Sequence, residues 1–187
     1  MNAFGAIALA LWVALIAASA AVWWISERAN KPVLGRTSLL VGIIGAEVLL
    51  TGTVAVLAAI GGPLGAPWSW LAVGVAAAAA GVTGGTVALT VLALADSSNR
   101  PGTTRVQRTV LRGGAWIGAL ERFATFGTLL AGWPEGLVAI VAVKAFARYP
   151  ELSTGQATGA IERFIIGTFT SLGWAAVCAG IATVFLL

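Results

Sequence analysis

Long apolar stretches alternate with short polar connections along all 187 residues of the chain. Only 10% of the residues are charged and 59% are hydrophobic, whereas a soluble domain averages about 25% charged residues. A helix needs about 20 apolar residues to cross the hydrocarbon core of a bilayer. The pattern therefore predicts a single all-α membrane domain over residues 1–187 with six transmembrane helices, at about 3–25, 38–60, 67–95, 113–132, 134–149 and 158–187.

Basic residues are confined to alternate connections between these helices. Several Lys and Arg residues lie in 26–37 and 96–112 and just before the connection that follows Tyr149, whereas 61–65 and 133–136 contain none. Cytoplasmic loops of membrane proteins carry the excess of Lys and Arg. With six helices, this alternation predicts that both termini lie outside the cytoplasm.

The sequence lacks the residues that most cofactor and metal chemistry requires. There is no histidine, and Cys178 is the only cysteine, which argues against zinc or haem centres, Ser–His catalysis and a disulfide framework. The formal charge of +4 is explained by topology-setting arginines and does not indicate nucleic-acid binding. We expect no cofactor, no metal and no nucleic-acid partner, and membrane lipids around the chain.

A motif of Gly-Ala followed closely by Glu, with Gly-Thr about one and a half turns later, occurs in three of the predicted helices. Its copies are Gly45-Ala46-Glu47 with Gly52-Thr53, Gly118-Ala119-Leu120-Glu121 with Gly127-Thr128, and Gly159-Ala160-Ile161-Glu162 with Gly167-Thr168. The second and third copies align over six residues, 118–123 with 159–164, an offset of 41 residues. At the same offset, Gly132-Trp133 aligns with Gly173-Trp174. Each copy lies on the returning arm of a predicted hairpin, so the pattern favours three hairpins of one type.

Seven charged residues lie within or near these apolar segments and are the candidate ion or ligand-binding residues: Glu47, Glu121, Arg122, Lys144, Arg148, Glu162 and Arg163. Neighbouring residues on a helix point about 100° apart, so each Glu-Arg dipeptide is expected to pair with other helices. Because an unpaired charge in the bilayer is costly, we expect the three Glu to oppose the basic residues in one cluster on the cytoplasmic side.

Two interpretations of this cluster stay open. It is either a static network that fixes helix register, or the lining of a polar cavity that binds an anionic headgroup, a small ion or a proton. Small residues at Gly81 and Gly85, and at Gly114 and Gly118, predict close helix packing, either inside the subunit or in a homo-oligomer.

The segment from about 113 to 172 also carries three recognisable elements. They are Ile117-Gly118-Ala119-Leu120-Glu121-Arg122, Val143-Lys144-Ala145-Phe146-Ala147-Arg148-Tyr149, and Glu162 leading to Ile166-Gly167-Thr168. Through them the chain resembles a family of uncharacterised small bacterial inner-membrane proteins. The resemblance implies a multi-pass protein of the bacterial cytoplasmic membrane with these charges in common, and it implies no activity.

The sequence favours a small transporter or channel-like protein with a charged cavity in the cytoplasmic half. The alternative is a non-catalytic scaffold or accessory subunit whose charges are structural. A third hypothesis is a lipid-binding or lipid-modifying enzyme. Because no His or Asp lies within the apolar segments, such an enzyme would depend on Glu alone, and the sequence favours a protein that is not an enzyme.

Overall fold

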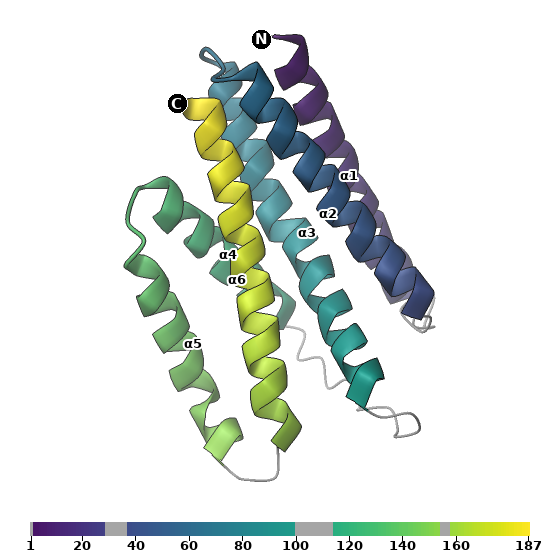
Figure 1. The fold of residues 1–187 in the computed structure, drawn as a ribbon. Coiled ribbons are helices and arrows are strands. Elements are labelled where there is room, and N and C mark those ends of the chain that lie inside the picture. The colour runs from purple at the N-terminus through teal and green to yellow at the C-terminus, as the bar shows by residue number, and fades with distance from the viewer. Residues whose placement is uncertain (1, 29–36, 100–113, 154–157) are drawn as a thin grey trace.

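The computed structural model describes residues 2–28, 37–99, 114–153 and 158–187, and these residues form an all-helical bundle (Figure 1). The helices are α1 (Ala3–Arg28), α2 (Thr37–Gly61), α3 (Trp68–Asn99), α4 (Gly114–Leu130), α5 (Gly136–Ser153) and α6 (Thr158–Leu186). Each of the six predicted helices is present. Their bounds agree with the predicted ranges to within a few residues.

The largest differences lie around the connection of α5 to α6. Helix α5 passes through Pro150 and ends at Ser153, not at Tyr149 as the sequence predicted. Proline removes one intrahelical hydrogen bond, and the helix continues for only about one further turn after Pro150. Helix α6 then begins at Thr158, as predicted.

The core lies where α3 and α6 pack along each other, with α1 and α2 against one side (Figure 1). Both central helices present small residues to this contact, among them Ala76, Ala79, Ala175 and Ala182, which are all fully buried. Small side chains let two helix backbones approach closely, which is how helices pack where lipid removes the hydrophobic driving force. Among the described residues, Trp12 and Phe185 are the largest side chains that are completely buried.

Helices α4 and α5 form a hairpin, of which α4 packs against α3 and α6 and contributes Phe126 to the core. The end of α4 is closed by Gly132, which has a φ of 69°. The Gly132 N–H donates to the Leu129 carbonyl and the Trp133 N–H donates to the Thr128 carbonyl, the two bonds of a Schellman cap. Helix α5 packs mainly against α4 and stands away from α6 in Figure 1.

In the part of the chain that the structure describes, four helices are long and apolar enough to cross a membrane: α1, α2, α3 and α6. Their outer faces carry exposed apolar side chains such as Leu49 and Phe169, as expected for surfaces in contact with lipid. The chain is thus a membrane protein with transmembrane helices. At 1.5 Å per residue, the 17 residues of α4 and the 18 of α5 span only about 26 and 27 Å, slightly less than a hydrocarbon core of about 30 Å.

We expect the core to reject a larger side chain at Ala58 but not at its neighbour Ala59. Ala58 is fully buried on α2, whereas Ala59 is exposed. Overpacking costs about 1–3 kcal/mol, so Ala58→Leu should lower the free energy of unfolding by that amount and Ala59→Leu should leave it nearly unchanged. Thermal unfolding of both purified variants in lipid nanodiscs checks this, and equal effects would contradict the packing of α2 described here.

Candidate functional site

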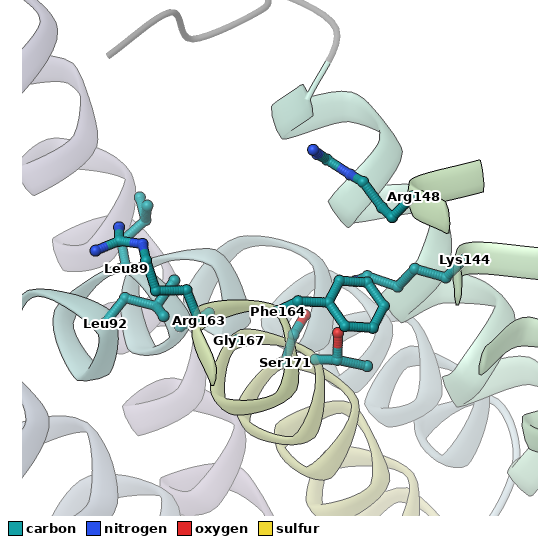
Figure 2. A pocket seen from close by; sticks show the side chains of 10 residues that line it. Leu89, Leu92, Lys144, Arg148, Arg163, Phe164, Gly167 and Ser171 are labelled. Atoms are coloured by element: carbon teal, nitrogen blue, oxygen red, sulfur yellow. The ribbon is translucent and has the colours of Figure 1, made fainter. Parts of the chain in front are cut away.

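A partly open cavity of about 390 Å³ lies between the C-terminal halves of α3 and α5 and the first half of α6 (Figure 2). Three basic side chains line it: Lys144, Arg148 and Arg163. The hydroxyl-bearing residues Thr168 and Ser171 lie deeper along α6, and the remaining wall is formed by Ala88, Leu89, Leu92, Phe164 and Gly167. The cavity therefore combines positive charge, hydroxyl groups and an apolar wall.

Lys144 is held by an ion pair between the two arms of the hairpin. Its Nζ bonds to Oε2 of Glu121 on α4, and both side chains are mostly buried, with exposed fractions of 20% and 15%. The prediction that Glu121 pairs across helices and not with its neighbour Arg122 is confirmed. Because α5 packs mainly on α4, this pair fixes where α5 lies.

Arg163 pairs with Asp96 at the end of α3, a residue that sequence reasoning assigned to the connecting loop. Both side chains are about half exposed, at 43% and 49%. Ion pairs with this much exposure contribute little to stability. The bond to Asp96 orients the Arg163 guanidinium at the edge of the cavity, where Figure 2 shows it opposite Arg148.

Arg122 points from α4 into a notch on α3. Its side chain is 7% exposed, and its Nε and one terminal nitrogen donate to the Gly81 carbonyl at 3.1 and 2.8 Å. The notch exists because α3 has glycine here: a Cβ at Gly84 would lie 2.6 Å from Cδ of Arg122, and one at Gly85 3.3 Å from a guanidinium nitrogen. No ion pair of Arg122 is found among the described residues, so backbone and hydroxyl groups solvate its charge.

The other terminal nitrogen of Arg122 links this notch to the cavity. It donates to Oγ of Ser171 at 3.3 Å, and Ser171 lines the cavity on its other side. Thr168, one turn earlier on α6, is 6% exposed, and its Oγ1 has no hydrogen-bond partner among the described residues. The deep end of the cavity thus presents one hydroxyl bonded to a buried cation and one hydroxyl free to bind a ligand.

The small-residue pairs have different surroundings. Gly81 and Gly85 face Phe123 and Arg122 of α4, so this pair packs inside the subunit. A Cβ at Gly118 would lie 3.3 Å from Arg122 of the same helix, and one at Gly114 would meet nothing within 4 Å. Contact between subunits through Gly114 stays a prediction.

The remaining two acidic candidates do not join the cavity, contrary to the single cluster expected from the sequence. Glu47 is 2% exposed between α1 and α2, where Ser19 donates to its Oε1 at 2.9 Å. Glu162 is exposed and lies only four residues after the start of α6, because that helix begins at Thr158. The charges expected in one cluster therefore divide among separate places in the bundle.

Sequence reasoning missed Asp96, Ser19, Thr168 and Ser171 as partners or lining residues. Asp96 was assigned to a loop, and the hydroxyl residues resemble the many other Ser and Thr of these helices. The one available signal was the Gly167-Thr168 element of the third motif copy, which does line the cavity.

Comparison with protein-family models, with curated proteins and with solved structures finds no match for this chain. The resemblance over about residues 113–172 consequently stays a prediction.

We expect Gly84→Ala to destabilise the protein and Gly74→Ala, on the same helix, to stabilise it slightly. A Cβ at Gly74 meets nothing within 4 Å, so Ala should there stabilise the helix by about 0.5–1 kcal/mol. At Gly84 the Cβ displaces the Arg122 side chain, at a cost of about 1–3 kcal/mol. Unfolding temperatures of the two variants measure the difference, and an unchanged or raised value for Gly84→Ala would argue against a tight notch.

Proposed function

We propose that this protein is a small multi-pass protein of the bacterial cytoplasmic membrane that binds an anionic amphiphile in the α3–α5–α6 cavity and acts as its transporter. The observation that carries the proposal is the convergence of Lys144, Arg148 and Arg163 on one cavity whose remaining wall is apolar except for the hydroxyl groups of Thr168 and Ser171. Basic residues at membrane depth are costly, and a ligand of opposite charge is a common reason for their presence.

The proposed orientation follows from the ends of the helices. Helix α3 ends and α6 begins at the same end of the bundle, and α5 also ends there, so the α4–α5 hairpin is inserted between two helices that meet at that end (Figure 1). The hairpin therefore leaves both termini on one side of the membrane whether it crosses the bilayer or only enters it. The basic residues flanking this end make it cytoplasmic by the positive-inside rule, with both termini outside.

The cavity offers an anion positive charges at increasing depth. Arg148 and Arg163 each lie five residues from the nearby helix end, or about 7 Å along the axis, and Lys144 lies nine residues from the end of α5, or about 13 Å. Ser171, 13 residues after Thr158, lies about 20 Å along α6, with the Arg122 charge directly behind it. An anion moving inwards would keep a cation or a polarised hydroxyl beside it.

The proposed ligand class is an oxyanion attached to an apolar body. Guanidinium and ammonium groups favour phosphate or carboxylate oxygens, to which they give charge-assisted hydrogen bonds. Leu89, Leu92 and Phe164 offer the same ligand an apolar surface within the cavity. An anionic lipid of the cytoplasmic leaflet has both parts, whereas inorganic phosphate has only the first.

The alternative is a non-catalytic scaffold or accessory subunit. The Glu121–Lys144 and Asp96–Arg163 pairs favour it, because each joins two helices and accounts for one lining cation without a ligand. The two functions differ in whether the cavity binds and moves an anion.

We expect the purified protein to bind short-chain phosphatidic acid at least about tenfold more tightly than phosphatidylcholine of the same chain length, a difference of about 1.4 kcal/mol. The triple variant Lys144→Gln, Arg148→Gln, Arg163→Gln should lose this preference, and Thr168→Val should weaken it without changing the charge. Native mass spectrometry in detergent measures both. The matched control is Arg100→Gln, Arg105→Gln, Arg108→Gln, which removes equal charge from the α3–α4 connection and should keep the preference.

Competition and flux complete this test. Inorganic phosphate that displaces the lipid identifies the oxyanion as the recognised part, and no displacement assigns recognition to the whole lipid. Movement of a fluorescent phosphatidic acid across proteoliposomes supports transport. Absence of both anion preference and flux would overturn the proposal and favour the scaffold.

The orientation has its own test, in a background in which the buried Cys178 is replaced by serine. In intact cells, a membrane-impermeant maleimide should label Gly65→Cys, in the exposed connection after α2, and should leave Arg105→Cys unlabelled until the cells are permeabilised. The reverse labelling pattern would show that the protein has the opposite orientation in the membrane.

A further inference from the structure

A second buried polar site lies between α1 and α2, apart from the cavity. Its centre is Glu47, whose side chain is 2% exposed. One carboxyl oxygen, Oε1, accepts a hydrogen bond of 2.9 Å from the Ser19 hydroxyl, and Ser19 is itself 3% exposed. The other oxygen, Oε2, is buried without any protein hydrogen-bond partner among the described residues.

Thr51 belongs to the same site. It follows Glu47 by four residues, so both side chains lie on one face of α2. Threonines on these helices commonly donate to the carbonyl four residues earlier, as Thr53, Thr83 and Thr90 do. Thr51 is 3% exposed and does not make this bond, so its Oγ1 is available beside Glu47.

The surroundings of Glu47 supply no positive charge. The helices that pack against α2 are α1, α3 and α6. Their ionisable residues in the described part of the chain are Asp96, Glu162, Arg163 and Cys178, together with Glu27 and Arg28 at the last two positions of α1. Arg163 is bonded to Asp96, and no ion pair of Glu47 is found among the described residues. An ionised carboxylate buried in this way would be left with a single hydroxyl donor, which does not offset its desolvation.

A proton or a small cation could neutralise such a group, and the arrangement favours the proton. A hard cation such as Ca²⁺ requires six to eight oxygen ligands, and Mg²⁺ requires six. No group of three or more His, Cys, Asp or Glu side chains is found among the described residues, and the Ser19 hydroxyl is already oriented as a donor to the carboxyl. In a neutral acid, Oε1 accepts from Ser19 and Oε2 carries the proton, so no charge is left buried without a counter-charge.

We propose that Glu47 is an occluded proton-binding site, protonated in the folded protein at neutral pH and held between α1 and α2 by its hydrogen bond to Ser19, with the unbonded Thr51 hydroxyl one turn away on the same face of α2. Release of the proton leaves a carboxylate in an apolar interface, so deprotonation requires α1 and α2 to separate there or water to enter. The site thus couples proton binding to the packing of these two helices. This inference rests on α1 and α2 alone and stands whether or not the α3–α5–α6 cavity binds an anion.

Infrared spectroscopy of the protein in lipid at pH 7 tests the proposal. The wild-type protein should show a carboxylic-acid C=O band that is absent from Glu47→Gln, while Glu162→Gln, which alters an exposed Glu, should keep it. Ser19→Ala should shift this band by removing the hydrogen bond to Oε1, without abolishing it. That variant leaves the carboxyl group intact, so it assigns the band even where Glu47→Gln folds poorly.

Linkage gives a second measurement. A folded protein that holds a proton released on unfolding loses stability as pH rises. From about pH 5 upwards, the folding equilibrium constant of the wild-type protein should fall by up to about tenfold per pH unit more than that of Glu47→Gln. A wild-type spectrum without the acid band would overturn the proposal, as would stabilisation by Na⁺ that is lost in Glu47→Gln, which would identify a cation site.

Discussion

The burial of the Arg122 guanidinium against the backbone of α3 is the interaction on which the C-terminal half of the bundle depends. A charge in this position must receive hydrogen bonds, and Gly81 and Ser171 provide their acceptors from two different helices. Access to the Gly81 carbonyl in turn requires that Gly84 has no side chain. Arg122 therefore joins α3, α4 and α6, and a change in this notch alters the packing of all three helices.

The cavity is a consequence of this arrangement and of the Glu121–Lys144 pair. Because α5 is attached mainly to α4, the ion pair determines where the basic face of α5 lies, and α6 does not close the space beside it. The basic residues that line the space are partly neutralised by Glu121 and Asp96 at its edges. The paired carboxylates stabilise the basic side chains when no ligand is bound, and the same side chains line the cavity, where a bound anion would contact them.

The two polar sites have opposite chemistry and occupy different helix interfaces. Around the cavity, basic side chains and hydroxyl groups suit an anion, whereas Glu47, Ser19 and Thr51 suit a proton. Here the α1–α2 interface and the α3–α5–α6 cavity are joined through α3 and α6, the helices that share the alanine-rich core.

The sequence by itself determined the helices, because twenty-residue apolar stretches and their polar connections depend only on local composition. It also predicted that Glu121 bonds across helices, since a 100° turn between neighbours separates it from Arg122. Only the tertiary structure decided which partner each charge has. Glu47, Glu121 and Glu162 occur in similar motifs, yet one is buried beside a serine, one pairs with Lys144 and one is exposed. Partner choice depends on which helix faces meet, and in an alanine- and glycine-rich chain many faces pack equally well, so the glycine notch for Arg122 becomes recognisable only once α3 and α4 are in contact.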